Sequence, residues 1–215
     1  MTGGQGGSHD ALILVDIQRD FCPGGALAVT DGDAVVDVAN RLQPTFDLVV
    51  ATQDWHPPNH GSFAANHPGK SPGDMVELGG LPQVLWPSHC VQGSLGAGFH
   101  PDLDLSHASA IIRKGTDPAI DSYSGFFDNG HRRTTGLAGL LREHGARHLF
   151  LVGLATDYCV RFTALDGVRE GFAVTVLLDG CRGVELSAGD VEAALNELRA
   201  AGVEIATSES AALPG

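Results

Sequence analysis

Six short apolar runs separated by amphipathic stretches constrain how this 215-residue chain can fold more than any other feature. The runs cover residues 11–17, 46–52, 108–114, 148–155, 173–179 and 203–208. Their hydrophobicity is continuous, which is typical of strands buried on both faces of a sheet. Alternation of such strands with helical stretches predicts a single α/β domain with a mainly parallel six-stranded sheet and helices on both faces.

The clearest helical pattern follows the fifth run. Four apolar residues of 187–202 share one helical face: Val191, Ala194, Leu195 and Leu198. Ser187 and Asp190 have the spacing of a capping box, and Gly202 supplies a stop. We therefore predict a helix here whose apolar face packs on the sheet.

Two segments do not follow the alternation. Residues 53–101 are rich in Gly, Pro and His and have no clear period, so we expect them to carry function or short local structure. The first ten residues, "MTGGQGGSHD", are Gly-rich and polar. We interpret residues 1–10 as a flexible lead-in. The domain is then expected to span 11–210, with an insertion at 53–101.

Charge and composition exclude several classes of partner. The net charge is −13 and the 13 basic residues are scattered, which argues against a nucleic-acid partner. No apolar run approaches the roughly 20 residues of a membrane span. No signal peptide is recognisable, and together with four cysteines this favours a reducing cytoplasm as the location.

The segment "GLATDYCVR" (153–161) places a cysteine just inside a predicted helix start. A cysteine can be a small buried hydrophobe, half of a disulfide, a zinc ligand or a catalytic thiol. The chain has no CxxC pattern, which argues against zinc, and a cytoplasmic location argues against disulfides. For Cys22, Cys90 and Cys181 packing is the favoured interpretation, whereas Cys159 stays a candidate nucleophile.

Three chemically useful residues lie at the ends of predicted strands. Asp16 and Lys114 end the first and third runs, and Cys159 follows the fourth. Each alone has an ordinary explanation, as a helix cap or surface carboxylate, a solvated lysine, and a packed thiol. Parallel sheets bind ligands beyond the carboxyl ends of their strands, so the three are expected to share one crevice. An acid, an amine and a thiol there have the composition of an activated nucleophile.

The helix start would also favour a thiolate. Thr156 or Asp157 can cap a helix beginning there, which places Cys159 in its first turn. The unpaired N–H groups, the helix dipole and Lys114 are expected to lower the pKa of the thiol, while Asp16 accepts its proton. The same N–H groups would face an oxyanion on an attacked carbonyl.

The insertion contains candidate metal ligands. Asp54 and His56 are two residues apart and point the same way in an extended segment, His60 follows, and "WPSHC" contains His89. A carboxylate with imidazoles suits zinc, iron or manganese. Chance clustering of ten histidines is the alternative, and a metal site alone would indicate hydrolysis by metal-activated water. The sequence has no HExxH, GxGxxG or P-loop motif.

Five segments, in order, resemble the bacterial nicotinamidases of the isochorismatase-like cysteine hydrolase superfamily. They are "LVDIQRDFCPGGALAV", "ATQDWHPPNHGSF", "WPSHCVQGS", "DSYSGFFDNG" and "GLATDYCVRFTALD", and the likeness extends over about 11–183. The resemblance implies a catalytic triad of Asp16, Lys114 and Cys159. It also implies one divalent metal ion, with zinc weakly favoured, whose ligands are these three: Asp54, His56 and His89.

The resemblance extends to the substrate pocket. It implies an aromatic wall of Phe21, Trp86 and Tyr123, with Tyr158 a weaker candidate. It further implies a cis peptide at 154–155 that directs the Ala155 N–H, with that of Cys159, at the oxyanion. His60 lies where some members recruit a further ligand, and we leave it unassigned.

The activity that the resemblance implies is hydrolysis of nicotinamide to nicotinate and ammonia through a cysteine thioester, in NAD salvage. The binding partner is then a small molecule, and assembly into a homo-oligomer is neither predicted nor excluded. A rival is an amidase of the same superfamily acting on a carbamoyl or ureido substrate. Such relatives share the acid–lysine–cysteine arrangement but generally lack the metal set, so Asp54, His56 and His89 discriminate between the two. Isochorismatase itself does not need the cysteine, and a non-catalytic metal-binding module has no use for the triad.

Overall fold

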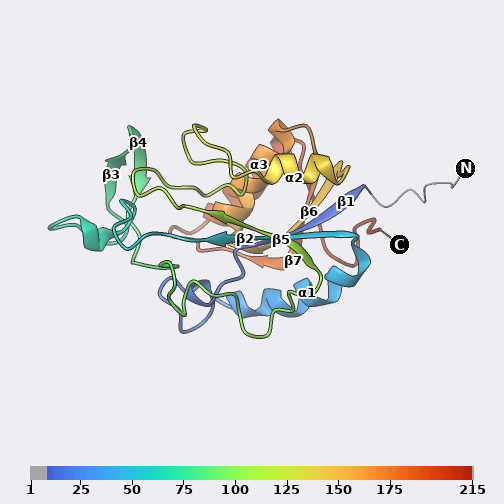
Figure 1. Cartoon of the computed structure of the whole chain (residues 1–215), viewed down its shortest axis with the longest axis horizontal. Helices are drawn as coiled ribbons and strands as arrows, with labels where there is room; N and C mark the ends of the chain where they lie inside the picture. Colours follow the sequence, from blue (N-terminus) through green and yellow to red (C-terminus); the bar gives the residue numbers. More distant parts are fainter. Residues whose placement is uncertain (1–8, 215) are drawn as a thin grey trace, which may run out of the picture.

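A six-stranded parallel sheet runs through the computed structural model, which describes residues 9–214 of the chain (Figure 1). Its strands, in the spatial order β5-β2-β1-β6-β7-β8, are all joined in parallel. They are β1 (Asp10–Val15), β2 (Leu48–Asp54), β5 (Ala108–Lys114), β6 (His148–Leu154), β7 (Ala173–Arg182) and β8 (Glu204–Ala206). The predicted fold class is confirmed, and all six apolar runs contribute a strand.

Helices cover both faces of the sheet (Figure 1). Helix α1 (Val35–Leu42) packs on one face, and α2 (Leu137–Glu143), α3 (Arg161–Arg169) and α4 (Asp190–Ala200) pack on the other. Within β1, Ile13 and Val15 belong to the core under α2–α4, whereas Leu12 and Leu14 belong to the core under α1. A central strand therefore needs apolar residues at successive positions, which explains its continuous hydrophobicity.

The edge strand β5 departs from the prediction of burial on both faces. Its residues alternate between partly buried and exposed, and Ile111 is 48% exposed. An edge strand has one neighbour, and here the helices leave one of its faces uncovered. The run therefore forms the predicted strand but not a doubly buried one.

The insertion contains local structure of its own. Strands β3 (Met75–Leu78) and β4 (Leu81–Val84) form an antiparallel hairpin, drawn in green at one end of the molecule (Figure 1). Isolated bridges join His56 to Val91 and Phe63 to Trp86, so the segments before and after the hairpin lie side by side.

Short 3-10 turns occur both outside and inside the insertion. They occupy Arg19–Phe21, Gly32–Ala34, Gln43–Thr45 and Ala64–Asn66.

Helix α4 forms where it is predicted, but its capping differs. Its N-cap is Gly189 and no side chain caps it, so the expected reciprocal capping box is wrong. The Asp190 carboxylate instead accepts the Ser187 N–H at 2.8 Å, which is half of that pattern. Gly202 follows the helix with φ +87°, consistent with its predicted role as a stop.

The first strand begins one residue before the first apolar run. Residues 1–8 of the expected lead-in lie outside the described residues, but His9 and Asp10 belong to the fold. Strand β1 begins at Asp10, and the His9 carbonyl accepts N–H groups of Arg147 and His148 at 2.7 and 3.1 Å. Within residues 9–214, no helix has both the length and the apolar character that crossing a membrane requires.

Candidate active site

The register of the sheet brings the strand-end residues together. Asp54 and Lys114 are register partners at the ends of β2 and β5, and Asp16 follows β1, which lies between β2 and β6. Cys159 follows the end of β6 by five residues. Four adjacent parallel strands thus end at one edge, and each contributes a polar side chain there.

Lys114 is the hub of this cluster. Its Nζ lies 2.8 Å from Oδ2 of Asp16, donates to Oδ1 of Asp54 at 2.5 Å and approaches Sγ of Cys159 at 3.4 Å. The Ser122 carbonyl accepts a further hydrogen bond at 3.0 Å. All of these side chains are buried, so water does not screen the charges. The three residues predicted from strand ends therefore meet around one ammonium group.

The turn that carries Cys159 differs from the predicted helix start. Thr156–Val160 form a π-helical turn whose N-cap is Ala155, and no side chain caps it. The Asp157 carboxylate is directed elsewhere, because it accepts the N–H groups of Val184 and Glu185 at 2.9 and 2.8 Å. The predicted cap by Thr156 or Asp157 is therefore wrong. Asp157 instead ties the nucleophile turn to the loop after β7.

The peptide bond before this turn is cis, as the family resemblance implies. It joins Leu154 to Ala155, directly before the π-helical turn. The Ala155 carbonyl accepts the N–H groups of Tyr158 and Val160, both at 3.1 Å. These bonds fix the backbone on both sides of Cys159.

Burial dominates the acid–base properties of the thiol. It raises the pKa of Cys159 well above its ordinary value, and Lys114 opposes this rise without overcoming it. The nearby Asp16 carboxylate raises the pKa of the thiol further. The expectation of a lowered thiol pKa is therefore wrong. The buried thiol keeps its proton at neutral pH, so the nucleophile requires a base.

The two charged partners of the thiol respond to burial differently. Burial raises the pKa of Asp16, and Lys114 only partly offsets that rise. Burial alone would lower the pKa of Lys114, but Asp16 and Asp54 outweigh it and raise that pKa well above its ordinary value. Lys114 is therefore a permanent cation, whereas Asp16 is a carboxylate of increased basicity.

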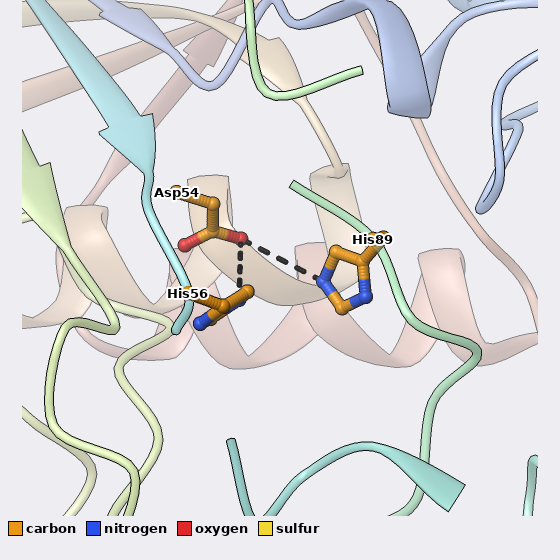
Figure 2. Close-up of side chains that lie close together, drawn as sticks. All are labelled: Asp54, His56 and His89. Carbon is orange, nitrogen blue, oxygen red and sulfur yellow. Dashed lines mark ion pairs between the residues drawn. The ribbon is translucent and has the colours of Figure 1, made fainter. Parts of the chain in front are cut away.

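A second cluster lies beside the first. Figure 2 shows one carboxylate oxygen of Asp54 facing both imidazoles; this Oδ2 lies 3.6 Å from Nε2 of His56 and 4.0 Å from Nε2 of His89. Each imidazole is oriented by a backbone carbonyl: Nδ1 of His56 lies 2.8 Å from the Gly115 oxygen, and Nδ1 of His89 lies 2.8 Å from the Pro87 oxygen. Both Nε2 atoms are thereby left to face the carboxylate.

This donor set fits a divalent metal ion. One carboxylate and two imidazoles, all buried, have ligand atoms within 4.8 Å of one another. Burial, then the neighbouring His56, lowers the pKa of His89 to about 4, so His89 is neutral and able to ligate at pH 7. Burial raises the pKa of Asp54, but Lys114 and His56 outweigh it and keep that carboxyl ionised.

Gly115 makes the position of His56 possible. A Cβ on this residue would lie 2.3 Å from the His56 ring, and its φ of +63° is one that side chains disfavour. The glycine directly after Lys114 therefore lets an imidazole approach the backbone at the strand end.

Aromatic side chains surround the two clusters. Phe21 lies beside His89, with ring centroids 5.5 Å apart. Trp86 donates its indole N–H to the Tyr123 hydroxyl at 3.2 Å, and both rings contact Tyr158, the neighbour of Cys159. The three predicted wall residues thus lie beside the two clusters, and Tyr158 contacts two of them.

Comparison with known proteins places this arrangement in a family. The family sequence model for the isochorismatase domain matches residues 10–210, which is nearly the whole chain. The chain belongs to the isochorismatase family. It is 53% identical over 201 residues to the nicotinamidase of Escherichia coli, covering 92% of this chain and 94% of that protein.

Solved structures agree with this assignment. The structure of an Acinetobacter baumannii nicotinamidase/pyrazinamidase superposes with a TM-score of 0.92 at 48% identity, covering 95% of this chain and 99% of that one. A Pyrococcus horikoshii pyrazinamidase in complex with zinc gives a TM-score of 0.76 at 41% identity, covering 93% and 99%. The resemblance predicted from the sequence is confirmed, including its nicotinamidase branch.

Several polar residues of this isochorismatase-family site are not among the predicted site residues. His60, which the sequence left unassigned, forms a second buried group with His56 and Asp121, and the Thr52 hydroxyl donates to Asp16. Gln18 donates to the Asp54 carbonyl at 2.9 Å and accepts the Asp54 N–H at 2.8 Å. For Thr52 and Gln18 the only sequence signal is a polar residue inside or just after an apolar run, which does not by itself specify a partner.

Proposed function

We propose that this chain hydrolyses nicotinamide to nicotinate and ammonia through a thioester on Cys159. The observation that carries the proposal is the position of Lys114, whose ammonium joins Asp16 and Cys159 to Asp54 of the second cluster. Thiol chemistry and a metal-binding donor set therefore share one buried site. The similarity to curated nicotinamidases over more than nine-tenths of the chain supports the substrate.

The first half-reaction begins with proton transfer. Asp16 takes the proton of Cys159 as the sulfur attacks the carboxamide carbon, and the carbonyl electron pair moves to its oxygen. The N–H groups of Ala155 and Cys159 are assigned to that oxyanion, and such a donor contributes about 3–4 kcal/mol to transition-state stabilisation. The C–N bond then breaks, and Asp16 returns the proton to the leaving ammonia.

The second half-reaction reverses these roles. A water molecule loses a proton to Asp16 and attacks the thioester carbonyl, the C–S bond breaks, and Asp16 returns the proton to the thiolate as the acid leaves and ionises to nicotinate. Lys114 stays charged throughout and offsets the negative charge that passes between Asp16 and the sulfur. Since the buried thiol has a raised pKa, the neighbouring carboxylate of increased basicity suits this exchange.

Asp54, His56 and His89 would hold a divalent metal ion, with zinc as the first choice. The donor set fits zinc, and a related pyrazinamidase was solved in complex with it. When bound, such an ion would ligate the pyridine nitrogen and fix the ring. Phe21, Trp86 and Tyr123 are assigned to the walls that hold the ring beside the thiol.

We assign the reaction to NAD salvage in the cytoplasm. Nicotinate is a pyridine that can re-enter nucleotide synthesis, and the curated relatives are nicotinamidases. Cys22, Cys90, Cys159 and Cys181 are buried free thiols, which agrees with a reducing compartment. A homo-oligomer remains compatible with this assignment.

Ammonia release by the purified protein tests the proposal. Nicotinamide should be hydrolysed, chelator should suppress the reaction, and added zinc should restore it. An ureido or carbamoyl amide serves as the competing substrate. Faster hydrolysis of that amide than of nicotinamide, with metal content verified, would contradict the proposal.

A further inference from the structure

The two carboxylate oxygens of Asp16 have different surroundings. Oδ1 accepts a hydrogen bond from the Thr52 hydroxyl at 2.7 Å. Among residues 9–214, no hydroxyl or backbone N–H holds Oδ2, which is buried and lies 2.8 Å from Nζ of Lys114. A carboxylate oxygen of Asp16 also lies within 4.8 Å of Sγ of Cys159. Thr52 thus holds Oδ1, whereas Oδ2 faces the Lys114 ammonium, and within the described residues no hydroxyl or backbone N–H competes there with a proton from the thiol.

The same hydroxyl also holds the backbone of Asp16. Oγ1 of Thr52 accepts the Asp16 N–H at 3.2 Å while it donates to the side chain. Asp16 has φ +47°, a left-handed conformation that non-glycine residues seldom adopt. A threonine hydroxyl can donate one hydrogen bond and accept others, so one group fixes both the turn and the carboxylate.

Packing alone does not account for a threonine at this position. Thr52 is fully buried in β2, between the ends of β1 and β5. Its methyl group lies 3.0 Å from the position that a Cβ on Gly125 would take. A valine would fill this space with the same shape, and only the hydroxyl distinguishes the two residues.

We propose that Thr52 is a positioning residue that anchors Oδ1 of Asp16 and so reserves Oδ2 as the proton acceptor for Cys159. This inference rests on the proposed function, in which Asp16 is the base. The terminal torsion of an aspartate is broad, so without an anchor the carboxylate plane can rotate and turn its second oxygen away from the thiol. The hydroxyl removes that freedom at the atom that exchanges a proton with the thiol and with ammonia.

Two substitutions of Thr52 distinguish the effect of its hydroxyl from the effect of its side-chain shape. Thr52→Val keeps the shape and removes the hydroxyl, whereas Thr52→Ser keeps the hydroxyl. Thr175→Val is the matched control, because Thr175 is also fully buried and its hydroxyl donates to Glu204 at 2.9 Å, at the opposite end of the sheet. Ammonia release gives kcat and KM, and iodoacetamide labelling followed by peptide mass spectrometry gives the reactivity of Cys159.

In Thr52→Val, kcat for nicotinamide should fall roughly ten- to hundredfold, a part of what a general base contributes. KM should stay within about twofold, because ring binding is untouched. Labelling of Cys159 should slow in parallel, and Thr52→Ser should recover kcat to within about threefold. Thr175→Val should keep wild-type kinetics and labelling.

Two results would overturn the inference. One is a wild-type kcat in Thr52→Val; the other is a Thr52→Ser variant as slow as Thr52→Val, which would make the role one of shape. If Thr52→Val does not fold, Thr52→Ala compared with Thr52→Ser gives the same contrast. Wild-type turnover of nicotinamide is measured alongside, so failure of the proposed function would show in the wild type and not only in the variants.

Discussion

The two halves of the site are held in different ways. In the acid–lysine–thiol half, Asp16 and Lys114 stand directly at strand ends, so the sheet register sets their positions. In the other half only Asp54 belongs to a strand, while His56 and His89 come from the insertion and are oriented by the carbonyl oxygens of Gly115 and Pro87, which lie in loops. The acid and the lysine are therefore placed by the sheet, whereas two of the three proposed metal ligands depend on loop packing.

The halves are nevertheless coupled through one side chain. Lys114 contacts Asp16 in the first half and Asp54 in the second. Loss of this cation would remove the counter-ion of the buried Asp16 and the main counter-ion of the buried Asp54. Variants on either side of Lys114 should therefore separate the halves, whereas a variant of Lys114 itself should disturb both.

The largest effect should come from Cys159→Ala. Without the nucleophile, kcat should fall roughly 10⁴- to 10⁶-fold, because nothing else in the site can form the thioester. Metal content per chain, measured by atomic emission, should not change, since the second half remains intact. Cys181→Ala removes another buried free thiol and should keep wild-type activity. Substantial turnover in Cys159→Ala would exclude the covalent route.

Lys114→Met should cost the most stability. Removal of a buried cation from two carboxylates should lower the free energy of unfolding by about 3–5 kcal/mol, measured by urea denaturation at pH 7. The pKa of Asp54 is lowered in the fold, so its ion pair contributes above the ordinary carboxyl pKa and is lost at lower pH. The difference in unfolding free energy between the wild type and Lys114→Met should therefore become smaller as the pH is lowered.

The exposed Lys70 provides the control for that variant. Lys70→Met should unfold with wild-type stability at every pH. If Lys114→Met were as stable as Lys70→Met, the buried carboxylates would not depend on this ammonium, and the coupling of the two halves would be wrong.

His89→Ala should disable the second half and spare the first. The protein should lose most of its bound metal, and kcat/KM for nicotinamide should fall roughly a hundredfold. Iodoacetamide should still label Cys159 at a near wild-type rate, because the thiol half is intact. His144→Ala, at an exposed helix end, is the matched control. Full metal occupancy in His89→Ala would remove His89 from the ligand set.

The smallest effect should follow Gly115→Ala. Its Cβ would displace the His56 ring, so metal affinity, measured by competition with a chelating dye, should fall roughly tenfold. Gly171→Ala has an equally unfavourable φ of +89° and open space around it, and it should lose some stability without loss of metal affinity. Equal metal affinity in the two variants would show that the close approach of the His56 ring to Gly115 is unimportant for metal binding.

Sequence patterns were sufficient where strand ends decide the geometry. Asp16, Lys114 and Cys159 could be grouped because parallel strands end at one edge, and the fold class follows from the same runs. The strand order could not be derived in this way, and β5 therefore has an exposed face that the pattern does not reveal.

The remaining errors come from contacts distant in sequence. Asp157 looks like a helix cap locally, but its partners Val184 and Glu185 lie 27 and 28 residues further along the chain. The pKa of Cys159 follows from complete burial and the nearby Asp16, neither of which the helix start discloses. Thr52 has a polar partner only because β1 and β2 are neighbours.

The most direct test of the central claim is to trap the acyl-enzyme during turnover. Hydroxylamine added to the reaction should convert the nicotinoyl thioester to nicotinohydroxamate at the expense of nicotinate, while ammonia release does not fall. Cys159→Ala should give neither product. Nicotinate as the sole product at every hydroxylamine concentration, or hydroxamate formation by Cys159→Ala, would contradict a thioester on Cys159.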